Sequence, residues 1–170
     1  MKPITVLALL ILALCCSGDP TAPPPDPPNG LTAGNAAWTH EKDGEPATRL
    51  PDSGIARFEP LCPSYFYLGN DPFIQFVFSP HTRVEKRTYS LANVADSLNN
   101  IAAVYSTHIY AFTNPPVPTT GQLTILYSSP TRVDGTFEFR GGGDSAGVVS
   151  TILVQGSFSA TAFSPPPACP

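Results

Sequence analysis

The stretch 133–140, Val-Asp-Gly-Thr-Phe-Glu-Phe-Arg, alternates apolar and polar residues with a period of two. Successive side chains of an extended chain point to opposite sides, so Val133, Phe137 and Phe139 share one face. Thr136, Glu138 and Arg140 fall on the other face, toward water. This period predicts a half-buried antiparallel strand.

A second stretch repeats the first one's pattern. Residues 133–137 and 154–158 both read Val-x-Gly-(Thr/Ser)-Phe. A glycine at a core-facing strand position either kinks the strand or leaves room for a neighbouring aromatic ring. We expect the two stretches to be neighbouring antiparallel strands, joined by a loop over Gly141–Ser145. The alternative is a coincidence between two short β-rich strings.

The same alternation extends over most of residues 31–163, between turn signals rich in Gly, Pro, Asn and Asp. Further strands are predicted over Leu31–Thr39, Ile55–Glu59, Tyr65–Leu68, Phe73–Ser79, Lys86–Leu91, Ala103–Phe112, Thr120–Tyr127 and Thr151–Phe163. Turns are predicted at Asn35, Pro51–Gly54, Gly69–Pro72, Ser79-Pro80 and Asn114–Pro116, and one short helix at Ala92–Ala102. Eight or nine short strands predict an all-β domain, either an antiparallel β-sandwich or a small barrel.

Composition agrees with a single apolar, turn-rich domain. The chain has 170 residues, of which 42% are hydrophobic, 13% are charged and 21 are proline. A formal net charge of -4 argues against nucleic acid as a partner. The aromatic residues can fill a core without a metal or cofactor, and we expect neither.

Several short strings occur together along residues 31–163. They are Gly34 to Trp38, Thr88–Leu91, Thr119–Ile125, Asp134–Phe139 and Gln155–Phe158. In this order the chain resembles a family of small bacterial lipoproteins, of the Bacteroidetes type, with a β-rich domain of unknown function. The resemblance implies a small β-sheet domain presented outside the membrane. It implies no activity and supplies no catalytic residues.

The N-terminus has the three parts of an export signal. Met1-Lys2 precedes an apolar run over Ile4–Leu14, followed by Cys15, Cys16 and small residues. The run spans only about 16 Å as a helix, too short to cross a membrane. We expect residues 1–15 to be a signal peptide and Cys16 to be the lipidated first residue of the mature protein. Lipidation at Cys15, and plain secretion with cleavage after Ser17 or Gly18, are the alternatives.

A proline-rich segment follows the signal. Six of the twelve residues 19–30 are proline, which leaves few backbone donors for helix or sheet. We expect residues 16–30 to form an extended tether that holds the domain about 35 Å from the membrane. A proline-rich ligand for a partner's groove is the alternative.

The exported domain contains two cysteines, Cys62 and Cys169. An oxidising compartment favours a disulfide between them, which would contribute at most about 4–5 kcal/mol. It would pin the proline-rich tail 164–170 near Pro60–Pro63. Two free thiols are the alternative.

Candidate catalytic residues are few. Ser145 lies in a Gly-x-Ser-x-Gly string (143–147), but no histidine follows it, as a hydrolase of that pattern requires. His40, His81 and His108 have no metal-ligand spacing, and no Cys-x-x-Cys pair occurs. Asp43, Glu45, Asp52 and Glu59 are scattered among turn residues. We therefore predict no catalytic, cofactor-binding or metal-binding residues, and a protein that is not an enzyme.

The aromatic strings 65–67 and 73–78 leave two interpretations open. Alternation places some rings on each face, so they are buried on both sides or form an exposed binding patch. The expected function is a noncatalytic, membrane-tethered envelope protein that binds a protein or small molecule or is structural, facing the outer membrane or periplasm. It would be secreted if not lipidated. A small-ligand carrier with a barrel-type pocket is the alternative, and a hydrolase is a third class for which the sequence offers no usable residue set.

Overall fold

The computed structural model describes residues 23–42, 50–59, 65–69, 73–78, 84–92, 100–106, 119–145 and 148–163. Within these residues the protein is all-β, as predicted, apart from the short 3-10 helix η1 (Pro28–Gly30). The strands are β1 (Asn35–Lys42), β2 (Leu50–Glu59), β3 (Tyr65–Gly69), β4 (Phe73–Val77), β5 (Thr88–Ala92), β6 (Asn100–Ser106), β7 (Thr120–Ser128), β8 (Arg132–Ser145) and β9 (Val148–Ala162). Among the described residues, none belongs to a helix that is both long and apolar enough for a membrane span.

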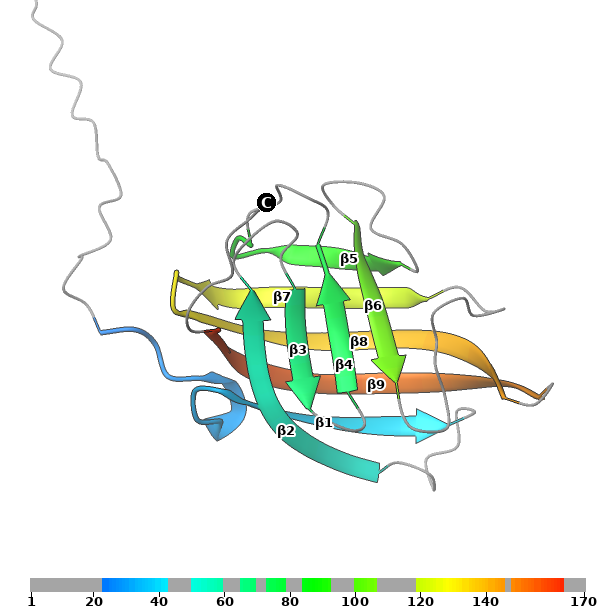
Figure 1. The fold of residues 1–170 in the computed structure, drawn as a ribbon. Coiled ribbons are helices and arrows are strands. Elements are labelled where there is room, and N and C mark those ends of the chain that lie inside the picture. Colours follow the sequence, from blue (N-terminus) through cyan, green and yellow to red (C-terminus); the bar gives the residue numbers. More distant parts are fainter. Residues whose placement is uncertain are drawn as a thin grey trace, which may run out of the picture.

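The nine strands form one sheet whose order closes into a ring, β1-β2-β3-β4-β6-β5-β7-β8-β9. Neighbours pair antiparallel except β5 with β6, and β9 closes the ring on β1. Figure 1 shows two layers: β2, β3, β4 and β6 (the front layer) cross in front of β1, β9, β8, β7 and β5 (the back layer). Strand β2 bends between them, because its first half pairs with β1 and its second half with β3.

Four sequence predictions of local structure are wrong. Asn35, predicted as a turn, is the first residue of β1 and pairs with Ile55 of β2. Gly141–Ser145 is not a loop but the end of β8, paired along its length with β9. Pro51–Gly54, predicted as a turn, belongs to β2 and pairs with β1. Asn100–Ala102, predicted as the end of a helix, lies in β6 beside β5. In each case cross-strand pairing overrides a local turn or helix preference. Residues 93–99 lie outside the described residues.

The repeated Val-x-Gly-(Thr/Ser)-Phe stretches are neighbouring antiparallel strands, as predicted. Each glycine lies opposite the phenylalanine of the other stretch: Gly135 pairs with Phe158, and Gly156 with Phe137. A Cβ atom on Gly135 would lie 2.8 Å from the Phe158 ring, and one on Gly156 would lie 2.6 Å from the Phe137 ring. The glycines therefore leave room for aromatic rings: in each stretch the glycine accommodates the phenylalanine of the other stretch.

Aromatic rings join the two layers through the interior. Three ring pairs connect front to back, with centroid distances of 5.4 Å for Phe66–Phe158, 5.3 Å for Phe76–Phe137 and 5.3 Å for Phe78–Tyr89. All six side chains are at least 95% buried. Each such side chain contributes about 1.5–3 kcal/mol by leaving water. Side chains of the two layers therefore meet across the interior at these three places.

Candidate binding face

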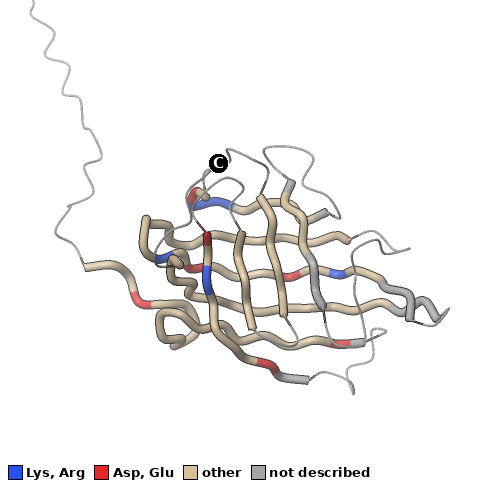
Figure 2. The backbone as a smooth tube through the Cα atoms, in the orientation of Figure 1, with Lys and Arg blue, Asp and Glu red and all other residues tan. Residues whose placement is uncertain are grey.

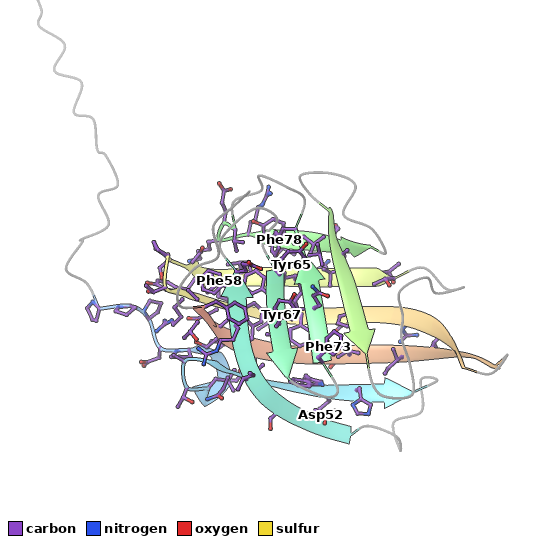
Figure 3. The ribbon with its side chains drawn as sticks, in the orientation of Figure 1. Asp52, Phe58, Tyr65, Tyr67, Phe73 and Phe78 are labelled. Atoms are coloured by element: carbon purple, nitrogen blue, oxygen red, sulfur yellow. The ribbon has the colours of Figure 1, made fainter. Side chains whose placement is uncertain are left out.

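The outer surface of the front layer carries a row of aromatic side chains. Burial alternates along β3 and β4, with Phe66, Leu68, Ile74 and Phe76 inside and their neighbours half-exposed outside. Because the period is two, Tyr65, Tyr67, Phe73 and Gln75 share the outer side. We define the aromatic face as Tyr65, Tyr67, Phe73, Gln75 and Phe163. Figure 3 labels three of its rings, on β3 and β4. The aromatic residues of 65–67 and 73–78 thus lie partly in the core and partly on the surface, which supports the interpretation that they form an exposed binding patch.

Contacts among neighbours hold these side chains in place. The ring centroids of Tyr65 and Tyr67 lie 6.2 Å apart, and those of Tyr67 and Phe163 lie 6.1 Å apart in an edge-to-face arrangement. Gln75 Nε2 donates a hydrogen bond of 3.2 Å to the Tyr67 hydroxyl oxygen. Phe163 is 39% exposed and follows β9, so it joins the face from the far end of the chain. Tyr67 is the centre of the face.

Tyr67 remains a neutral hydrogen-bonding group over the physiological pH range. Partial burial raises the pKa of Tyr67 above its ordinary value of 10.0, and the Glu59 carboxylate and Tyr65 raise it further. Since Gln75 donates to its oxygen, the Tyr67 hydroxyl keeps its own proton for an acceptor. Tyr67 therefore offers a ligand both an aromatic ring for stacking and a hydroxyl group that donates a hydrogen bond.

The aromatic face itself carries no formal charge. Strands β3 and β4 contain no charged residue, and Figure 2 shows both as uncharged tubes. Arg57 and Glu59 flank them on β2, where the Arg57 guanidinium donates to the Thr161 hydroxyl of β9. In the β2–β3 register, Arg57 lies opposite Tyr67 and Glu59 lies opposite Tyr65, so one cation and one anion border the uncharged rings on the same side of the sheet.

The outer surface of the back layer differs, because the N-terminal segment (residues 23–30) covers part of it. Asn29 Nδ2 donates to Ser157 Oγ at 3.1 Å, and the Arg132 guanidinium donates to the Pro25 carbonyl. Helix η1 contacts both β8 and β9. Pro25 and Asn29, in the second half of the predicted tether over 16–30, thus contact the domain. For residues 16–22 the tether stays a prediction.

A polar cluster lies beneath this covered region. Asp134 is 1% exposed although it points to the outer side of β8, and Ser159 is fully buried. The Asp134 carboxylate accepts 2.7 Å from Ser159 Oγ and 2.9 Å from Arg132 Nη2. The Arg132 guanidinium also lies 4.8 Å from the centroid of the Tyr127 ring. We call Arg132, Asp134, Ser157 and Ser159 the covered polar cluster. Ser157 and Arg132 of this cluster hold the N-terminal segment against the domain, so its role is structural.

A histidine–aspartate pair, not anticipated from the sequence, lies where β1 meets β2. His40 Nδ1 is 2.8 Å from Asp52 Oδ2, and both side chains are partly exposed. Nearby, the buried Trp38 indole nitrogen has no hydrogen-bond partner among the described residues. No spacing rule could have paired His40 with Asp52, because the β1–β2 register brings them together.

Ser145, the serine of the Gly-x-Ser-x-Gly string, lies far from this pair. Ser145 pairs with Val148 at one end of β9, whereas His40 pairs with Val154. Six strand residues separate these positions, about 20 Å. Because a catalytic serine must lie within hydrogen-bond reach of its histidine, Ser145 and His40 cannot act together in this fold.

Other sequence predictions fall outside the described residues. They concern Cys15, Cys16, Cys62, Cys169, His81, His108, Asp43 and Glu45. Lipidation at Cys16 or Cys15 and the Cys62–Cys169 disulfide stay predictions. Within the described part of the chain, no three His, Cys, Asp or Glu side chains gather in a way that could hold a metal ion.

Comparison with known proteins adds no assignment. No family model, curated protein or solved structure matches this chain. The resemblance to small bacterial lipoproteins stays an expectation from short motifs, and the candidate site rests on geometry.

Proposed function

We propose that this protein is an exported, lipid-anchored, noncatalytic binding domain of the bacterial cell envelope, and that the aromatic face is its contact surface. The observation that carries this proposal is a row of half-exposed rings on β3 and β4, which are fixed by mutual contacts and a hydrogen bond. Rings that are already ordered lose little conformational entropy when a ligand covers them.

The N-terminal segment fixes where an anchor would attach. It contacts β8 and β9, so an anchor at Cys16 would join the domain on the outer side of these two strands. Only seven residue steps separate Cys16 from Pro23, about 20 Å of extended chain. A lipid-anchored domain would therefore lie close to the membrane surface.

The interior packing favours a surface-binding domain over a small-ligand carrier. Ring pairs such as Phe76–Phe137 span the space in which a carrier's ligand would lie. We infer that the strand ring is a small barrel with a filled interior. The separation of Ser145 from His40 likewise supports a noncatalytic role.

The anchor is tested by the mass of the mature N-terminus. The full chain is expressed in a bacterial host and purified from membranes. We expect a protein that starts at Cys16 and carries acyl chains, and that moves to the soluble fraction in Cys16→Ala. An unmodified mature N-terminus in the membrane fraction would contradict lipidation.

The contact surface is tested by photo-cross-linking in intact cells. A benzophenone side chain replaces Phe73 on the aromatic face or, as the matched control, Leu126, which is exposed on the back layer. We expect a discrete, saturable cross-linked product from position 73 only, and its loss in Tyr67→Ala. Equal products from both positions, or a product insensitive to Tyr67→Ala, would place the binding surface elsewhere.

A further inference from the structure

We propose that residues 164–170 of this chain occupy the aromatic face, which therefore binds an extended proline-rich segment. The inference rests on the proposed function, because it names the class of ligand for the same surface and its occupant within the molecule. The observations that carry it are the position of Phe163 and the composition of the chain that follows.

Strand β9 delivers the chain to the aromatic face. Its last residues run parallel to β2, with Thr161 beside Arg57 and Ala162 beside Phe58. The Phe163 amide donates to the Phe58 carbonyl at 3.1 Å, and the Phe163 ring meets Tyr67 edge-to-face. The chain therefore leaves its last described residue on the outer side of the front layer, within contact distance of Tyr67.

The following residues suit this surface chemically. Residues 164–170 read Ser-Pro-Pro-Pro-Ala-Cys-Pro. Such a segment favours the polyproline II conformation, which spans about 20 Å over seven residues. The distance from β2 to β4 is about 10 Å, so the segment is long enough to cross the face. Polyproline segments dock on aromatic surfaces at low entropic cost, because their conformation is already set.

Tyr67 and its neighbours offer the complementary groups. A polyproline II backbone has carbonyl oxygens without internal hydrogen bonds. The Tyr67 hydroxyl accepts from Gln75, and so its own proton is directed to an acceptor other than Gln75. Tyr65 and Phe73 supply ring surface on either side. The predicted Cys62–Cys169 disulfide points the same way, since Cys62 is three residues before Tyr65 in the sequence.

The test is hydroxyl-radical footprinting of the full chain and of a variant that ends at Phe163. If the tail covers the face, its removal raises the oxidation rates of Tyr65 and Tyr67 several-fold. Tyr127, which packs under Arg132 on the back layer, serves as the internal control and keeps its rate. Unchanged rates at Tyr65 and Tyr67 would overturn the proposal.

Two further variants keep the result interpretable if truncation affects folding. Replacing Pro165, Pro166 and Pro167 by Ser keeps the chain length, and we expect it to expose the same two rings. Cys169→Ser, which retains the prolines, is expected to expose them less than truncation does. Protection that survives the proline replacements but disappears on dilution would show that a second copy covers the face, which overturns the proposal.

A synthetic peptide with the sequence of residues 164–170 provides the reverse test. Added to the truncated chain, it should restore protection at Tyr65 and Tyr67, and Tyr67→Ala should abolish this effect. No restoration at any peptide concentration would count against a proline-binding face. Tail binding without any cross-linked envelope partner would instead leave this inference standing and contradict the proposed function.

Discussion

The outer surfaces of the two layers differ in which side chains are exposed: aromatic rings on the front layer are partly exposed, whereas polar groups on the back layer are buried. On the front layer, Tyr65 and Tyr67 lie half-exposed where a strand pattern ordinarily places polar residues. On the back layer, Asp134 and Ser159 are buried where the pattern predicts exposure to water. The difference arises because a chain segment covers the back layer. Period-two alternation predicts which side of the sheet a residue faces. Whether that side is exposed to solvent depends on whether another segment of the chain covers it.

The largest expected effect comes from the covered polar cluster. Asp134→Ala removes the acceptor of Arg132 and Ser159 and leaves an uncompensated, largely buried guanidinium. Breaking a buried pair in this way costs about 3–5 kcal/mol of unfolding free energy. The control, Glu138→Ala, lies on the outer side of the same strand but is exposed, and should cost less than about 0.5 kcal/mol. Urea denaturation measures both, and equal losses would show that the cluster is not effectively buried.

The next effect tests the inner side of the back layer. A Cβ atom on Gly156 would lie 2.6 Å from the Ala37 carbonyl oxygen as well as from Phe137. Gly156→Ala should therefore destabilise the domain by about 1–3 kcal/mol, because a backbone atom cannot move aside cheaply. In Gly141→Ala, the nearest atom is the Thr119 hydroxyl oxygen at 3.2 Å, so the loss should be clearly smaller. If the urea denaturation midpoint of Gly156→Ala equals that of the wild type, Gly156 does not pack closely against Phe137.

A smaller effect concerns the docking of the N-terminal segment. Asn29 has a positive φ of 55°, so Asn29→Gly removes its hydrogen bond to Ser157 without adding backbone strain. One such bond contributes about 1 kcal/mol, which corresponds to about fivefold in an opening equilibrium. We expect the Leu31 amide, which donates to the Pro28 carbonyl at 3.1 Å, to exchange faster by that factor. Hydrogen exchange that does not change would mean that other contacts hold the segment.

The smallest effect is the alkaline titration of Tyr67. Its pKa is raised in the folded state, so above pH 10 the unfolded chain loses this proton first. Stability contributed by the neutral phenol is fully present below pH 10 and declines as the pH rises through the folded-state pKa. Spectrophotometric titration should show a late tyrosine step that Tyr67→Phe removes. A late step that persists in Tyr67→Phe belongs to another tyrosine.

Much of the fold followed from local pattern. The all-β class, the existence of most strands and the pairing of the two Gly-Phe stretches were predicted from alternation and repetition. The errors at Pro51–Gly54 and Gly141–Ser145 have one cause: Pro, Gly, Asp and Ser favour turns locally, and the predictions relied on that local preference. In the fold, the register with β1 and β9 supplies hydrogen bonds that outweigh that preference.

The candidate site was only partly predictable. The two aromatic strings indicated rings on both faces, and Tyr65, Tyr67 and Phe73 are indeed on the outer one. Phe163 could not be assigned to the same surface, because it is 96 positions away from Tyr67 in the sequence and meets it only through the β2–β9 pairing. The His40–Asp52 pair was missed for the same reason.

The sequence by itself determined that the chain forms strands and which side chains fill their shared interior, because alternation is a property of neighbouring residues. Tertiary structure decided how the sheet closes and which outer surface the N-terminal segment covers. Asn29 reaches Ser157 across 128 positions, and no local pattern encodes such a contact. Its formation depends on the closed strand order that brings β8 and β9 under the N-terminal segment.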